Sequence, residues 1–237
     1  MCGRFTLHTE KEALAQRFKV GLDTLQRLEP RYNIAPSQPV LTIREVNAKR
    51  LAEPMRWGLV PSWTKDPSTL PSLINARKET VATKPSYRDS FRRRRCLIPT
   101  DGFYEWQAPI GLSRVKTPYW VSLTTGKPFA LAGLWSEWHP QDVQEPQEPL
   151  RTCTIITAPA CPPLEHLHTR MPVILPQDAE SAWLDPSLDG NRDQLEKLLS
   201  RVPEFALRAH PVSRRVNSAR NEGPELITPA DEPSLGF

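Results

Sequence analysis

The sequence has no run of about 18 apolar residues, so it contains no candidate for a membrane-spanning helix. Its start lacks the basic-then-apolar pattern of a secretory signal. The four cysteines, Cys2, Cys96, Cys153 and Cys161, include no CxxC pair, which argues against a zinc site and against a disulfide framework. GxGxxG, P-loop and HExxH motifs are also missing. We therefore expect a protein of the reducing cytoplasm that uses no metal and no other cofactor.

Proline, in contrast, is abundant. The 237 residues include 26 prolines, which is roughly twice the usual share of about 5%. They are dispersed between apolar runs, as turn residues are, and do not form a disordered tract. The composition predicts short strands joined by many loops, with few long helices.

Apolar periodicity predicts the individual elements. A capping box of Thr9 and Glu12 predicts a helix over residues 9–19. Shorter helical patterns cover residues 23–28, 76–83, 178–184 and 191–199. Strands are expected over residues 40–44, 55–60, 96–98, 103–106, 119–123, 129–138, 152–157, 171–175 and 207–212.

The chain shows no internal repeat and no linker that would separate two domains. We predict a single α+β domain over residues 1–229, with a mostly antiparallel, barrel-like sheet and peripheral short helices. Residues 139–149 are polar and rich in proline and are expected to form a surface loop. Residues 230–237 are expected to form a flexible C-terminal tail.

Positive charge is concentrated in one segment. The formal net charge is +4, but residues 65–95 contain nine Lys or Arg and three Asp or Glu, which gives that segment 9 − 3 = +6. A basic patch of this kind indicates a phosphate-bearing partner. A charged face that only contacts solvent is an equally good interpretation of the composition.

The second residue offers unusual chemistry. A methionine followed by a small residue is a usual substrate of methionine aminopeptidase, and removal of Met1 would give Cys2 a free α-amine beside its thiol. The amine can condense with an aldehyde to a Schiff base, and the thiolate can then add to the same carbon and close a thiazolidine ring. We hypothesise that Cys2 is an exposed covalent trap for an aldehyde. The alternative is an incidental residue of a frayed terminus.

Glu105 lies among aromatic residues in a strand pattern. Alternation along the strand puts Glu105 on the same face as Phe103, with Tyr104 and Trp106 on the other face. On a core face, desolvation would raise the pKa of the carboxyl group and suit it to general acid catalysis. The alternative is an ordinary surface acid.

Two pairs combine a polar group with a cation two residues away. In an extended segment His168, Arg170 and also His166 would point the same way, so that Arg170 could bind a phosphate and His168 could transfer a proton. A structural histidine is the alternative. Asn75 precedes Arg77 at the same spacing and could bind a sugar or carbonyl oxygen, or cap the helix that follows.

Trp63 and Trp106 could stack on nucleobases. They could equally belong to the core, because the chain has seven tryptophans.

Together these segments form a recognisable pattern. In chain order they are MCGRF, RYNIAPSQ, MRWGLVPSW, INARKET, RCLIPTDGFYEW, FALAGLW, HTRMPVIL and PVSRRVN. In content and spacing the chain resembles the SRAP family, the SOS response-associated peptidase proteins that process abasic sites in DNA. The resemblance extends from residue 1 to about residue 229.

The resemblance implies a curved, barrel-like antiparallel sheet with an active site beside a basic DNA channel. It implies binding of single-stranded DNA and of junctions with duplex that contain abasic sites, by a monomer in the cytoplasm that is nucleoid-associated when bound to DNA. Mature Cys2 would form a thiazolidine crosslink with the ring-opened aldehyde of the abasic site and release it again, shielding the strand during the DNA damage response. The implied catalytic residues are Cys2, Asn75, Glu105 and His168; the implied DNA contacts are Arg4, Arg77 and Arg170, with Trp63 and Pro36 near the DNA path.

In this mechanism Glu105 would transfer protons at the Cys2 amine and the sugar oxygen, His168 would help to open the sugar, and Asn75 would hold Cys2 or the open sugar. Cys161 and the two prolines that follow depart from the family pattern, as does the long segment 139–149. Two alternatives stay open. One is a cysteine peptidase with Cys2 as nucleophile and His168 as base, and the other is a purely non-covalent binder of single-stranded DNA.

Overall fold

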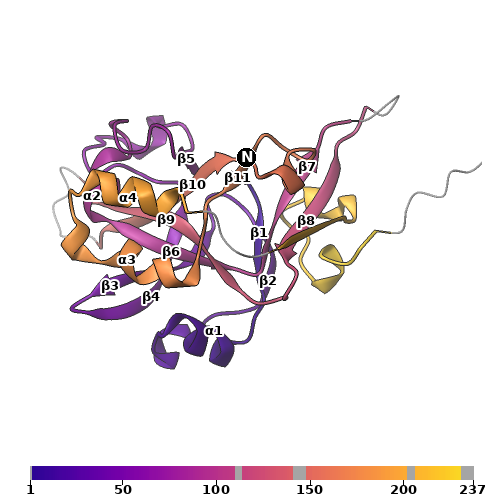
Figure 1. The fold of residues 1–237 in the computed structure, drawn as a ribbon, viewed down its shortest axis with the longest axis horizontal. Helices are drawn as coiled ribbons and strands as arrows, with labels where there is room; N and C mark the ends of the chain where they lie inside the picture. The colour runs from indigo at the N-terminus through magenta and orange to yellow at the C-terminus, as the bar shows by residue number, and fades with distance from the viewer. Residues whose placement is uncertain (1, 110–113, 141–147, 202–205, 231–237) are drawn as a thin grey trace, which may run out of the picture.

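The computed structural model describes residues 2–109, 114–140, 148–201 and 206–230. These residues form two β-sheets with short helices around them, which confirms the predicted α+β class (Figure 1). The strands divide between two sheets, whereas the sequence predicted one. The described helices are α1 (Lys11–Phe18), α2 (Arg88–Arg93), α3 (Glu180–Leu184) and α4 (Arg192–Leu199).

The larger sheet has eight strands, and five of them close into a ring. The order is β11-β10-β4-β3-β6-β9-β12, and β9 pairs with β10 as well as with β6, so that β10, β4, β3, β6 and β9 encircle the core. Pairing is antiparallel except where β10 meets β4 and β5. The strands are β3 (Pro39–Val46), β4 (Lys49–Trp57), β5 (Asn75–Arg77), β6 (Arg95–Thr100), β9 (Phe129–Trp138), β10 (Leu150–Pro159), β11 (Arg170–Pro172) and β12 (Ile174–Leu175).

The smaller sheet has five strands in the order β13-β8-β7-β1-β2. These are β13 (Leu207–Pro211), β8 (Thr117–Leu123), β7 (Gly102–Gln107), β1 (Phe5–Leu7) and β2 (Arg31–Ile34). The sequence pattern did not predict β1, yet Phe5 pairs with both Phe103 in β7 and Ile34 in β2. A three-residue strand is too short to show a periodicity, and pairing on both sides compensates for its length.

The predicted capping box of Thr9 and Glu12 is wrong. Helix α1 begins at Lys11, and its N-cap Glu10 makes no side-chain cap hydrogen bond. The Thr9 hydroxyl donates to the Asp101 carboxylate instead, which also accepts from the backbone N–H of His8 and Thr9. Asp101 joins β6 to β7, so this contact ties the start of α1 to the junction of the two sheets.

The helix predicted over residues 76–83 is also wrong. Residues 75–77 form β5, which runs parallel to β10 with Asn75 opposite Ile155, and turns occupy residues 78–83. The Lys78 N–H donates to the Thr157 carbonyl oxygen (2.8 Å), so the chain completes a sheet edge where the sequence pattern indicated helix. Tertiary pairing overrides local propensity here.

The expected strand at residues 55–60 is the end of β4, which begins earlier, at Lys49. A hairpin joins β3 to β4 through Asn47 and Ala48, both at positive φ (51° and 58°), which matches the right-handed twist of the paired strands. Most of the expected loop 139–149 and of the expected tail lies outside the described residues, and the domain limits stay a prediction. No helix in the described part of the chain is long and apolar enough to cross a membrane.

Gly133 in β9 allows the close approach of neighbouring side chains inside the ring. A Cβ atom placed on Gly133 would lie 2.8 Å from the Cys96 sulfur and 2.9 Å from Ile98 Cδ1. We expect Gly133→Ala to lower the free energy of unfolding by about 1–3 kcal/mol through overpacking. Urea denaturation of G133A, C96A and the double variant measures this.

Cys96→Ala should recover part of the loss in the double variant, because it removes one of the two contacts. A G133A protein as stable as the parent chain would contradict the tight packing of the ring.

Candidate active site

The start of the chain is held against β7. The N–H of Tyr104 donates to the carbonyl oxygen of Arg4 (2.9 Å), which continues the β1–β7 pairing beyond Phe5. Two residues before Arg4, the Cys2 side chain is 0% exposed and belongs to the main apolar core. The expected exposed thiol is therefore wrong for the chain that carries Met1. The expected position beside Glu105 is supported, because the pKa of the Cys2 thiol depends on the Glu105 charge.

Asn75 fixes the backbone of Cys2. Its side-chain nitrogen donates to the Cys2 carbonyl oxygen (2.7 Å), and the Tyr87 hydroxyl donates to the carbonyl oxygen of Asn75 itself (3.0 Å). The side-chain oxygen of Asn75 is buried, and no hydrogen-bond partner for it lies among the described residues. Asn75 thus belongs to a strand and caps no helix.

Glu105 is buried. Phe103 (0% exposed) and Glu105 (4% exposed) lie on one face of β7, and Tyr104 on the other face packs into a second apolar cluster with Trp120. Both faces of the strand are covered, so the surface-acid alternative is wrong. Burial raises the pKa of Glu105 to about 7, while the charge of Lys116 acts in the opposite direction.

The Cys2 thiol responds to the same environment. Burial raises its pKa, and the Glu105 carboxylate raises it further. The thiol is therefore protonated at neutral pH, and it forms a thiolate only when a base removes its proton. Glu105, whose pKa lies near neutrality, is charged in part at that pH and lies close enough for its charge to act on the sulfur.

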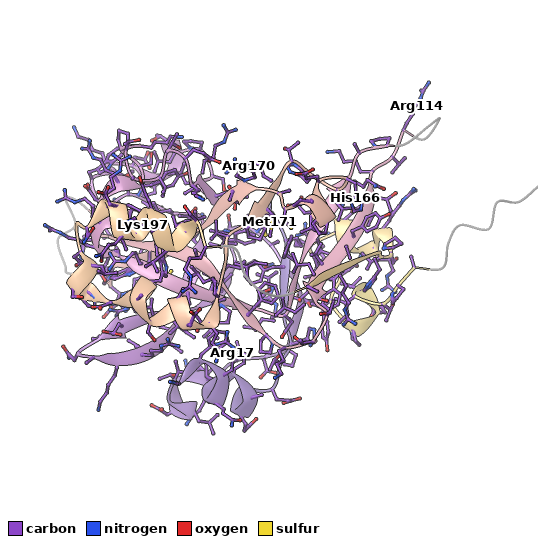
Figure 2. The ribbon with its side chains drawn as sticks, viewed as in Figure 1. Arg17, Arg114, His166, Arg170, Met171 and Lys197 are labelled. Atoms are coloured by element: carbon purple, nitrogen blue, oxygen red, sulfur yellow. The ribbon has the colours of Figure 1, made fainter. Side chains whose placement is uncertain are left out.

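His168 follows a tight turn and not the expected extended segment. Pro162–Leu164 form a 3₁₀ turn, residues 165–167 continue as a turn, and only Arg170 begins β11. Prolines at the first positions fix φ and favour this start. His166 is exposed and packs edge-on to Tyr119 in β8 (ring centroids 6.3 Å apart), so it does not share a direction with Arg170 (Figure 2).

The electrostatics of His168 favour a neutral ring. The half-buried side chain has a lowered pKa, first because of desolvation, and the positive charges of Lys116 and Arg170 act in the same direction. Its Nδ1 accepts from the backbone N–H of Arg170 (2.9 Å). The neutral ring therefore carries its proton on Nε2. The positive charge of Lys116 acts to lower the pKa of both His168 and Glu105.

The three predicted phosphate-binding arginines differ in their surroundings. Arg170 forms a bidentate ion pair with Glu79 (2.9 and 3.0 Å) and donates to the Thr157 carbonyl oxygen (2.6 Å). Half-buried Arg4 donates through one nitrogen to Asn33 Oδ1 (2.6 Å) and to a backbone carbonyl oxygen (2.8 Å). Arg77 is exposed at the outer edge of β5.

Asn33 is a residue that the sequence analysis did not select. It is 0% exposed, accepts from Arg4, and donates to the carbonyl oxygens of Val216 (3.3 Å), Ser218 (2.9 Å) and Asn221 (2.8 Å). An amide inside an apolar strand, within the RYNIAPSQ segment, was the available indication. Asn33 thus anchors the C-terminal segment and Arg4 at the same point.

The remaining predicted contacts lie at the surface to different degrees. Trp63 is 53% exposed, whereas Trp106 is half-buried and donates to Asn217 Oδ1 (2.8 Å). Pro36 is half-buried between β2 and β3. Trp63 therefore presents the larger open ring surface of the two tryptophans.

The site thus joins a residue-two cysteine to an amide through a hydrogen bond and to a carboxyl group through its charge, and the His168 imidazole shares the influence of Lys116 with that carboxyl group. The family model of the SOS response associated peptidases (SRAP) matches residues 1–219. The chain belongs to this family.

Named relatives agree with the assignment, and a solved structure shares the fold. The chain is 40% identical over 228 residues to the abasic site processing protein YoqW of Bacillus subtilis (strain 168), covering 96% of this chain and 99% of that protein. It is 33% identical over 279 residues to the abasic site processing protein HMCES of Rattus norvegicus, covering 98% and 76%. A crystal structure of a Bacteroides thetaiotaomicron protein shares the fold, with a TM-score of 0.81 at 24% identity over 97% of this chain and 100% of that one.

The raised pKa of Glu105 makes the stability of the protein depend on pH. The folded state binds the proton more tightly than the unfolded state, so this stabilisation is complete below about pH 4.5 and is lost as the pH rises through 7. Glu105→Gln stays neutral throughout. We expect the stability of E105Q relative to the parent to increase by about 3 kcal/mol between pH 4.5 and pH 8, measured by urea denaturation.

Glu79→Gln is the matched control. The hydrogen bond from Arg170 lowers the pKa of Glu79, so the loss of stability in E79Q should be present at neutral pH and disappear in acid. The stability of E79Q relative to the parent therefore changes with pH in the direction opposite to that of E105Q. A pH-independent difference between E105Q and the parent would contradict the buried carboxyl group.

Proposed function

We propose that this protein processes abasic sites in DNA by forming a reversible covalent link between Cys2 and the ring-opened aldehyde of the abasic sugar. One observation carries the proposal: a cysteine at position two is held through its backbone by Asn75 while its thiol lies beside a carboxyl group with a pKa of about 7. The names of the relatives, which are abasic site processing proteins, support the same substrate.

The link needs both groups of a terminal cysteine. After removal of Met1, the Cys2 amine attacks the aldehyde carbon, and loss of one water gives an imine. The thiol then adds across the C=N bond: sulfur bonds to carbon, the thiol proton passes to nitrogen, and a thiazolidine forms. An internal cysteine has no amine to supply the first step, so position two is essential to the reaction.

Glu105 is the proton carrier in this scheme. With a pKa of about 7 it is partly charged and partly neutral near neutral pH, so it can accept a proton from the amine or thiol and return one to the leaving oxygen. The thiol needs such a base, because burial keeps it protonated. Proton transfer of this kind is worth roughly 10²–10⁴-fold in rate.

His168 and Asn75 complete the chemistry. The His168 ring, neutral and protonated on Nε2, can donate to the ring oxygen of the closed sugar and favour the open aldehyde. Asn75 holds the Cys2 carbonyl oxygen, which fixes the direction of the amine, and its second side-chain group is available to the sugar. Positioning lowers the entropic part of the barrier.

The DNA strand would be bound through its phosphates. Exposed Arg77 is the direct contact that we propose, and Arg170 would exchange Glu79 for a phosphate. Arg4, which is already held by Asn33, would act mainly by positioning β1. Stacking on Trp63, Trp106 and Pro36, a preference for junctions, the monomeric state and a place at the nucleoid stay predictions.

Cysteine peptidase activity is a weaker interpretation of the same site. A peptidase nucleophile is favoured by a lowered thiol pKa, and burial here raises it. Neither peptide cleavage nor non-covalent binding of single strands requires a cysteine at position two.

Cys2→Ala should abolish the adduct that survives denaturing electrophoresis when the protein is mixed with single-stranded DNA containing one abasic site. Cys161→Ala, which removes the partly exposed thiol next to Pro162, should leave adduct formation unchanged. Intact mass should show protein plus DNA less one water for the parent and for C161A. An equal adduct yield from C2A would refute the role of Cys2.

The same assay separates the alternatives. Peptide turnover that Cys2→Ser abolishes, in the absence of any DNA adduct, would favour a peptidase. Equal affinity for intact and abasic strands, again without adduct, would favour a non-covalent binder.

A short peptide fused before Met1 and left uncleaved should prevent the adduct, because Cys2 then has no free amine. Proteolytic removal that makes Cys2 the first residue should restore it. Adduct yield and intact mass before and after cleavage measure both effects. An adduct of undiminished yield in the uncleaved fusion would rule out the thiazolidine.

A further inference from the structure

A second basic site lies at the end of α2, apart from the residues that hold Cys2. A hollow of about 470 Å³ opens there, between α2 and β9 (Figure 1 locates both elements). It is lined by Ser62, Asp89, Arg92, Arg93, Arg94 and Trp135. None of these residues makes a hydrogen bond to Cys2, Asn75, Glu105 or His168 within the described residues.

The charges in the hollow are not balanced. Three arginines face one aspartate, and Asp89 is itself exposed and 3.9 Å from Arg88. In the parts of the chain that the structure describes, no carboxylate lies within ion-pair distance of Arg92, Arg93 or Arg94. Other arginines are paired, such as Arg17 with Glu180, Arg44 with Glu53 and Arg170 with Glu79.

Arg95, the fourth residue of the arginine run, has a structural role. Arg95 is 5% exposed and donates to the carbonyl oxygens of Trp183, Asp185 and Arg92 and to the Asp189 carboxylate. Its three predecessors have no such set of acceptors. The basic run therefore divides into one buried structural arginine and three that are available to a ligand.

The hollow is built before any ligand arrives. The backbone N–H of Trp135 donates to the Arg94 carbonyl oxygen (2.9 Å), and the guanidinium carbon of Arg94 lies 5.8 Å from the centre of the Trp135 ring. Arg44 approaches the same ring at 4.9 Å. Contacts with the ring restrict Arg94, so a ligand need not order it.

An exposed aromatic ring adjoins the basic residues. Ser62 and Arg94 also line a smaller neighbouring hollow that includes Trp63, whose side chain is 53% exposed. A planar aromatic surface next to unpaired guanidinium groups is the combination that single-stranded nucleic acids bind, with bases stacked on the ring and phosphates at the cations.

We propose that this hollow binds the phosphodiester backbone of the DNA strand that flanks the abasic site. The inference rests on the proposed function for the identity of the strand, and it adds a contact surface separate from the reacting groups. An acidic polypeptide would also match the arginines, but it would leave the open face of Trp63 without a partner. The observations therefore favour nucleic acid.

The experiment compares two variants with the same loss of charge. Arg92→Gln with Arg93→Gln removes two arginines from the hollow, whereas Arg88→Gln with Arg192→Gln removes two exposed arginines that do not line it. Affinity for an intact 30-nucleotide strand and for a 6-nucleotide strand is measured by fluorescence anisotropy at several salt concentrations. Thermal unfolding confirms that each variant is folded.

We expect R92Q/R93Q to bind the 30-nucleotide strand about tenfold more weakly than the parent, with a salt slope that is less steep by about 1.4, which is about 0.7 for each phosphate contact. Binding of the 6-nucleotide strand and the adduct yield with a 6-nucleotide abasic strand should be unchanged. R88Q/R192Q should lose less than twofold.

Equal affinity of R92Q/R93Q and the parent for the long strand would overturn the proposal, and so would an equal loss in the control variant. Loss of binding to polyglutamate without loss of DNA binding would assign the hollow to an acidic polypeptide and overturn it as well. Failure of the parent to form any adduct would instead refute the proposed function, while the comparison of affinities would still test the hollow.

Discussion

Pairing of β1 with β7 is the constraint on which the candidate site depends. The strand is only three residues long, yet it has a partner on each side, and the hydrogen bond from Tyr104 to Arg4 extends its order toward the start of the chain. A terminus is usually among the least ordered parts of a domain. Here Cys2 lies inside the core, and Asn75 from the neighbouring sheet fixes the Cys2 carbonyl oxygen.

Burial then determines the chemistry of the groups that meet there. The same desolvation raises the pKa of the Cys2 thiol and of the Glu105 carboxyl group and lowers that of His168, so that all three shift toward their neutral forms. In water the carboxyl group would be fully charged at neutral pH and the thiol largely protonated. Burial raises the pKa of the thiol by more than that of the carboxyl group, so Glu105 becomes a stronger base while the Cys2 thiol becomes a weaker acid.

Much of the fold could be predicted from local patterns, and the failures have physical causes. Long alternating or apolar runs such as β9 and β10 can be recognised as strands from the sequence. In contrast, β1 is too short to show a periodicity, and β5 forms a strand only by pairing with β10. Thr9 found a partner in Asp101, 92 residues away along the chain, and so did not cap its own helix. Contacts of that separation are invisible to a pattern within one window.

The candidate residues were found mainly through motif resemblance, but the sequence did not predict the contacts and burial of their side chains. No local pattern shows that Cys2 is buried, that Arg170 already has Glu79 as a partner, or that Arg95 is structural while its three neighbours are not. The environment of Glu105 was the exception, because alternation with Phe103 indicated its face correctly. The chain passes from one sheet to the other at Asp101, and a single residue gives no sequence pattern that would predict this division.

The passage at Asp101 also has a mechanical consequence. Asp101 is the single residue between β6 in the ring and β7 in the smaller sheet. The two sheets are therefore joined at this point by a connection too short to let them move apart. A force applied to the start of the chain along β1 would act against hydrogen bonds on both flanks of that strand at once. Such shear loading resists rupture better than peeling a strand from an edge, and the connection would spread the force into the closed ring.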